Sequence, residues 1–199
     1  LRRNYCQDWE RAAVIEYRDS LNGVSYTSPA GIRIHGNCSR NFPQKSFALF
    51  ARRMYGNGKF RFRFFPGKQN DAFEAILLRN SGNDNGRSMF RDGLMAALAR
   101  EVGNLDYQAW QPVSVYLNGE YWGIYNLREK LNEHYFTDNH GIEPDQLEMF
   151  KDTDRQVHGN SDGIDELISF ISDNDLDEPA SWAWISEQLD IASFINYFI

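Results

Sequence analysis

The strongest constraint on the fold is a β-hairpin pattern in residues 112–129, PVSVYLNGEYWGIYNLRE. Two runs in which apolar and polar residues alternate lie on either side of Asn118-Gly119. Alternation with a period of two is typical of a strand that buries one face. Asn-Gly favours the two-residue turn whose twist matches that of paired strands. The sequence therefore predicts an antiparallel sheet as a main part of the fold.

Five further segments of the first half have strand patterns. We expect these strands at 9–19, 31–36, 46–53, 60–65 and 73–80. The first of them ends at the turn signal Leu-Asn-Gly. In FRFRFF (60–65) aromatic residues alternate with Arg, which predicts one buried face and one basic face.

A helix is predicted over residues 87–103, directly after the turn-like segment SGNDNG (81–86). One of the polar side chains at 83–85 is suited to accept hydrogen bonds from the first free N–H groups of this helix. Gly93 lies in the helix interior, where it costs about 1 kcal/mol relative to Ala. We therefore expect Gly93 to allow close packing against a strand.

The second half is mainly helical in pattern. We expect helices at 129–141, 163–174 and 179–199, and a short strand within 142–154. The last segment is apolar on several faces, which predicts that it is buried. The order of elements predicts an α+β fold with a β-rich lobe at 1–128 and a helical lobe at 129–199.

The charge is unevenly distributed. The net charge of −7 excludes a general nucleic-acid binder. Residues 1–110 carry 17 Lys and Arg against 10 Asp and Glu, whereas residues 111–199 carry 4 against 18. This asymmetry favours two lobes with different electrostatic roles, a basic one for an anion and an acidic one for a divalent cation. The alternative is that the acidic stretches are solvated loops.

The chain has no run of about 18 apolar residues, so no membrane span is predicted. The first ten residues lack the apolar stretch of a signal peptide, so the protein is either cytosolic or has lost a signal. Cys6 and Cys38 are too far apart in sequence for a metal site. Two free, partly buried thiols are the favoured interpretation, and a disulfide between them is the alternative.

Three segments, in the same order along the chain, resemble the CotH (spore coat protein H-like) kinase family. GIRIHGNCSRNFPQKSFALFARRMYG is similar to the family segment G-I-R-x-x-G-N-x-S-R-x-x-P-K-K-S. LLRNSGNDNGRSMFRDGLMAALARE resembles the L-R-N-x-x-x-D segment and the R-D helix that follows it. VYLNGEYWGIYNLREKLNEHYF resembles the Y-L-N-G-x-Y-x-G-x-Y segment. Together they cover most of residues 31–150.

The resemblance implies an atypical protein-kinase-like fold. Residues 1–128 would form the small lobe, an antiparallel sheet with one helix, and 129–199 the start of a helical large lobe. The implied cofactors are ATP and a divalent metal, Mg or Mn, in the full-length protein. The implied partners are proteins with Ser or Thr acceptors, or other surface and coat proteins, and the implied location is extracellular or at the cell surface.

Lys45 matches the family position of the Lys that pairs with the α- and β-phosphates of ATP. The resemblance implies this role, and an exposed Lys at a strand start is the alternative. Relatives carry two successive Lys where this chain has Gln44-Lys45. In kinase-like lobes a carboxylate on the helix steers this Lys, and we prefer Asp92 to Glu101 for that task.

Other candidate cofactor-binding residues lie on the same lobe. Arg33, Arg40 and Arg79 are interpreted as phosphate or loop-bracing contacts, with ordinary surface arginines as the alternative. Residues 127–130 form the implied hinge, whose backbone would hydrogen-bond to adenine, and Glu129 is expected to brace it. We predict no catalytic residue and no metal ligand in this chain.

A phosphoryl-transfer site also needs an Asp that orients the acceptor and an Asp that holds magnesium. In the family these two Asp residues follow a buried helix, and residues 185–199 of this chain resemble that helix. We therefore expect this sequence to stop before the catalytic loop and to be inactive by itself. The alternative function is a non-catalytic surface or coat-protein-binding module, which the aromatic-Arg segment 60–65 favours.

Overall fold

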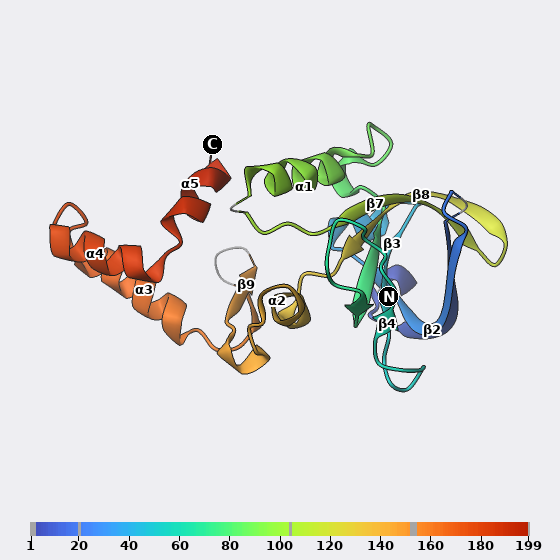
Figure 1. Ribbon diagram of the computed structural model, residues 1–199, viewed down its shortest axis with the longest axis horizontal. Helices are drawn as coiled ribbons and strands as arrows, with labels where there is room; N and C mark the ends of the chain where they lie inside the picture. Colours follow the sequence, from blue (N-terminus) through green and yellow to red (C-terminus); the bar gives the residue numbers. More distant parts are fainter. Residues whose placement is uncertain (1–2, 20, 104, 152–154, 199) are drawn as a thin grey trace. The chain divides into compact units, whose positions relative to one another are not determined.

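The computed structural model describes residues 3–19, 21–103, 105–151 and 155–198 (Figure 1). The chain divides into two compact units. Unit 1 comprises Leu1–Leu98 and Tyr107–Leu131, and unit 2 comprises Ala99–Asp106 and Asn132–Ile199. The lobe boundary at residue 128 stays a prediction.

Unit 1 is built on a six-stranded sheet in which every pair of neighbouring strands is antiparallel. In spatial order its strands are β1 (Glu10–Asp19), β2 (Val24–His35), β3 (Ser46–Phe50), β6 (Ala75–Arg79), β8 (Glu120–Glu129) and β7 (Trp110–Leu117). The sheet curls so far that its first and last strands meet. Gln111 of the last strand donates a hydrogen bond to the Tyr17 hydroxyl of the first, at 2.8 Å. The mixed α+β fold, with its curled antiparallel sheet, is compatible with a kinase-like small lobe, as expected.

The predicted hairpin is confirmed as β7 and β8. Asn118 and Gly119 both have positive φ, 53° and 86°, as a two-residue turn with matching twist requires. The strand predicted at 31–36 is the end of the longer β2, whose residues 24–33 pair with the whole of β1.

One face of the sheet carries the main core, to which residues 60–65 contribute. Phe60, Phe64 and Phe65 are at most 2% exposed and pack with Leu49 and Ile76. The expected strand is wrong in length, because only β4 (Phe60–Arg61) pairs, with β5 (Ala72–Phe73). Beyond it the chain turns its rings into the core instead of continuing a ladder. These aromatics therefore do not form the exposed surface that favoured a binding module.

Helix α1 (Arg91–Val102), whose first eight residues belong to unit 1, begins four residues later than predicted. A short 3₁₀ helix, η3 (Gly82–Asp84), and Met89, at a positive φ of 59°, keep residues 85–90 out of the helix. Asp84 still acts as the predicted cap, since its Oδ2 accepts a hydrogen bond from the Arg91 backbone N–H at 3.2 Å. The close approach at Gly93 is also confirmed, because a Cβ there would lie 2.2 Å from the Trp110 indole.

Unit 2 is mainly helical. Its elements are α2 (Glu133–His140), η4 (Pro144–Gln146), β9 (Met149–Lys151), β10 (Arg155–His158), α3 (Asp162–Asp173), α4 (Pro179–Gln188) and α5 (Ile191–Phe198). The sequence did not predict β10, which pairs with β9. Gly141, at φ 69°, ends α2 as expected.

The expected burial of residues 179–199 is wrong for the part of this segment that the structure describes. Trp182, Phe194 and Phe198 are 52%, 56% and 70% exposed. Within unit 2, α3 and α4 pack through a stacked Phe170–Trp184 pair, 3.9 Å between ring centroids. A single layer of helices leaves its outer side in solvent. Among the described residues, no helix is long and apolar enough to cross a membrane.

Candidate functional site

The backbone around Lys45 is held by buried hydrogen bonds. Asn80, which is 1% exposed, donates to the Gln44 carbonyl at 2.6 Å and accepts from the Ser46 hydroxyl at 2.8 Å. The Tyr125 hydroxyl donates to the Lys45 carbonyl at 2.7 Å. Hydrogen bonds from Asn80, directly after β6, and from Tyr125 of β8 therefore hold the backbone at Lys45 in place.

The ammonium group of Lys45 has local partners. Its Nζ donates to the Phe42 carbonyl at 2.5 Å and lies 4.3 Å from the centre of the Tyr5 ring. Asp92, the expected steering carboxylate, pairs with other residues. The other acid on the helix, Glu101, pairs with its exposed neighbour Arg100 at 2.8 Å.

Asp92 lies between two arginines of the sheet. Its Oδ2 is 2.7 Å from Nη1 of Arg128 and 3.3 Å from Nη1 of Arg79. The Arg128 side chain is only 4% exposed, and its Nη2 donates to the Gln108 carbonyl at 3.3 Å. The close Asp92–Arg128 contact is an ion pair without hydrogen-bond alignment, and among the described residues Nε and Nη1 of Arg128 have no hydrogen-bond acceptor. One carboxylate thus balances two guanidinium groups.

His35, at the end of β2, reports the charge of this region. Its pKa is lowered from 6.5 to about 4, first by burial and then by the positive charges of Arg79, Lys130, Arg33 and Arg40. The charged groups named here are all cationic, so the surroundings of His35 disfavour its protonation.

The structure therefore brings three predicted arginines together around His35, with Asp92 joined to them through Arg79. Arg33 also stacks on the Phe50 ring, 4.9 Å away. Arg40 donates to the Gly36 carbonyl at 2.6 Å, which braces its own loop. The structure does not join Lys45 to this group.

Glu129 is placed as a brace. It is 2% exposed, and its Oε2 accepts a hydrogen bond from the Ala109 backbone N–H at 2.8 Å. Lys68 Nζ lies 3.5 Å from the same carboxylate oxygen. Glu129 thus fixes the end of β8 against the start of β7, and its carboxylate is engaged within the protein.

The sequence did not reveal a polar network that positions α1. Asn126 of β8 donates to the Ser81 hydroxyl at 2.7 Å and to the Met89 carbonyl at 3.2 Å. It also accepts from the Trp110 indole N–H. A signal was present, because Asn126 is a polar residue in a strand whose neighbours Tyr125 and Leu127 face the core.

The chemistry of these groups fits an anion and not a metal. Guanidinium groups in a partly desolvated site suit phosphate oxygens, which accept charge-assisted hydrogen bonds. A divalent cation takes oxygen ligands such as carboxylates, carbonyls and waters, and not guanidinium groups. No group of three or more His, Cys, Asp or Glu suited to a metal occurs in the described ranges.

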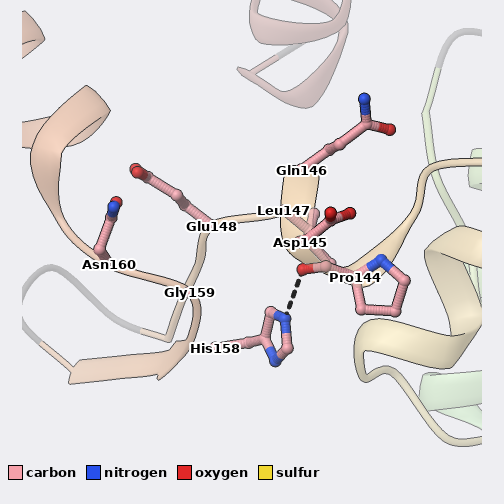
Figure 2. Close-up of a pocket in the computed structure, with 8 residues that line it drawn as sticks. All are labelled: Pro144, Asp145, Gln146, Leu147, Glu148, His158, Gly159 and Asn160. Carbon is pink, nitrogen blue, oxygen red and sulfur yellow. Dashed lines mark hydrogen bonds between the residues drawn. The ribbon is translucent and has the colours of Figure 1, made fainter.

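A separate pocket of about 490 Å³ lies in unit 2, between η4 and the end of β10. Figure 2 shows His158 reaching Pro144 across it, with a hydrogen bond of 2.7 Å to the Pro144 carbonyl. Glu148 lines the same pocket, and its carboxylate accepts from the Gly163 N–H near the start of α3 at 3.5 Å. None of the predicted cofactor-binding residues lines this pocket.

The low pKa of His35 predicts a pH-dependent stability. An unfolded chain binds a proton at His35 below about pH 6.5, whereas the folded chain resists it down to about pH 4. The free energy of unfolding should therefore fall as the pH drops through this window, by about 2–3 kcal/mol from this group. Urea unfolding of the wild type and of His35→Gln from pH 8 to pH 4 measures it. The gap between the two proteins should change with pH, and a constant gap contradicts the prediction.

Comparison with known proteins identifies the family. The family model described as CotH kinase protein matches residues 32–199, a span that contains the six predicted residues and His35. A search of curated proteins found no match. The family match agrees with the three resembling segments and with the α+β architecture. The chain belongs to the CotH kinase family.

Proposed function

We propose that this chain is the nucleotide-binding part of an ATP-dependent protein kinase, and that the cationic site around His35 holds the phosphates. Family membership supports a kinase-like protein, and kinases use ATP with a divalent metal such as Mg or Mn. The observation that carries the proposal is the group of cationic side chains near His35, to which a polyphosphate would bind.

Each predicted residue has a task in this proposal. Arg33, Arg40 and Arg79 donate to phosphate oxygens, and Asp92 keeps Arg79 oriented through their 3.3 Å contact. Lys45, on its rigid backbone, reaches a phosphate once its ammonium leaves the Phe42 carbonyl. Bound ATP supplies the phosphoryl group.

The substrates and the location follow from the family resemblance. We propose Ser and Thr hydroxyls of secreted, surface or coat proteins as acceptors, at the cell surface or outside the cell. The residues assigned above bind and orient, and none of them is an Asp that activates an acceptor. For these 199 residues alone we therefore expect nucleotide binding without phosphoryl transfer.

Arg79→Gln tests the phosphate site. This change removes one guanidinium and leaves Asp92 paired with Arg128, so the fold should persist. We expect the Kd for ATP, measured by calorimetry, to rise about tenfold, which corresponds to about 1.4 kcal/mol for a lost charge-assisted contact. The matched control is Arg18→Gln on β1, whose side chain is 78% exposed and pairs with Glu16, and its Kd should stay within about twofold.

The imidazole of His35 gives a local second readout. A bound triphosphate offsets the neighbouring arginines, so the pKa of His35, followed by NMR, should rise when ATP is added. Equal ATP affinities of Arg79→Gln and Arg18→Gln, together with an unchanged His35 pKa, would contradict the proposed site.

A further inference from the structure

The N-terminal segment, residues 4–8, lies on the loop that leads to Lys45. It contains the 3₁₀ helix η1 (Asn4–Cys6), whose Cα atoms come within 8 Å of those of η2 (Cys38–Asn41). The Tyr5 ring covers the Lys45 ammonium at 4.3 Å, and Asp8 Oδ1 is 2.8 Å from Arg40 Nη2. The segment thus contacts Lys45 and Arg40, two of the cationic side chains assigned to phosphate binding.

Both cysteines lie inside this contact. Cys6 follows Tyr5 and precedes Asp8, while Cys38 lies two residues before Arg40. Both thiols are free, and both residues are exposed. The two cysteines therefore lie in two short helices that approach each other, and a disulfide between them requires their Cα atoms to come within about 7 Å.

The contacts described for the N-terminal segment lie at or near the surface. No residue of η1 is buried, and the Asp8 side chain is 68% exposed. Tyr5 and Gln7 border a cavity of about 370 Å³ together with Ile34 and Phe47 instead of filling it. Exposed ion pairs contribute little to stability, so the segment can lift away from Lys45 and Arg40 unless a covalent bond holds it.

We propose that Cys6 and Cys38 form a redox-controlled disulfide that locks residues 4–8 over Lys45 and Arg40 and closes both side chains to anions. The disulfide itself is independent of the proposed function, and only its effect on phosphate binding rests on it. The oxidant is a small-molecule disulfide such as oxidised glutathione. One thiolate attacks it and releases a glutathione thiolate, the second thiolate attacks the mixed disulfide and releases the other, and the two thiol protons pass to solvent.

The first test counts thiols in the 199-residue protein after equilibration with oxidised glutathione. We expect the wild type to lose both free thiols, to lose the mass of two hydrogens and to stay monomeric. Cys6→Ser and Cys38→Ser are matched controls, and each should keep a single thiol or carry one glutathione. Retained thiols, glutathione adducts or disulfide-linked dimers of the wild type would overturn the proposal.

The second test measures whether Lys45 is covered, without any nucleotide. The rate of Lys45 acylation by an amine-reactive ester, followed by mass spectrometry, should fall about fivefold or more on oxidation of the wild type. It should not change in Cys6→Ser, and Lys151 provides an exposed reference in the same sample. Equal Lys45 rates in oxidised and reduced wild type would overturn the locking role. Loss of ATP binding in every redox state would instead refute the proposed function and leave both of these readouts intact.

Discussion

Replacement of Asp92 by Asn should lower the free energy of unfolding by about 3 kcal/mol. The change keeps the size of the side chain and removes the carboxylate that pairs with both Arg79 and Arg128. The Arg128 side chain is 4% exposed, so its charge cannot recover by hydration. The favourable interaction of Asp92 with the first turn of α1 is lost as well. Urea unfolding of the purified chain, followed by circular dichroism, measures the difference.

Glu101→Gln on the same helix is the matched control for Asp92. Glu101 is 71% exposed and pairs with its neighbour Arg100, so its change should be below about 0.5 kcal/mol. Removing Arg79 in the Asp92→Asn background should restore about 1 kcal/mol, because the remaining arginines then repel less. Comparable losses for Asp92→Asn and Glu101→Gln would show that Asp92 does not balance this pair.

The local elements of unit 1 could be predicted because their signals are local. Asn118-Gly119 specifies its turn by the positive φ of both residues, and alternation in β7 and β8 follows from one buried face. The prediction of a strand over residues 60–65 is wrong in length because it also rested on a local signal. Their alternation describes burial correctly, since Phe60 and Phe64 are buried, but burial alone does not decide whether the backbone pairs as a strand.

The candidate site could be predicted only in part, because it depends on distant pairings. Arg33, Arg40 and Arg79 were identified individually, but the nearness of Arg33 and Arg79 to His35 follows from the pairing of β2, β3 and β6. Arg128, which holds Asp92, was hidden in a hinge segment where the backbone was expected to matter more than the side chain.

The partner of Asp92 likewise could not be predicted from the sequences of helix α1 and of the start of β3, where Lys45 lies. Whether Lys45 or an arginine meets this carboxylate depends on how α1 sits on the sheet. That position is set by the Asn126 network, in which Asn126 follows Ser81 by 45 residues and Met89 by 37.

Gly93→Ala should lower the free energy of unfolding by about 2 kcal/mol, although Ala is the better helix former. Helix propensity alone would stabilise the variant by about 1 kcal/mol. The new Cβ would lie 2.2 Å from Cε2 of Trp110, and overpacking of this kind typically costs 1–3 kcal/mol or more. Trp110 cannot easily move away, because its indole N–H is bonded to the buried Asn126.

A double-mutant cycle with Trp110→Leu separates the two effects of Gly93→Ala. The leucine side chain removes the indole atoms that the new Cβ would meet, so only helix propensity remains. In that background Gly93→Ala should become neutral or stabilising by up to about 1 kcal/mol, measured by urea unfolding. A cost that persists without the indole would mean that backbone entropy at Gly93, and not the approach of α1 to β7, sets the requirement for glycine. A reversal of sign would establish that this contact fixes the helix on the sheet, and with it the position of Asp92 between its two arginines.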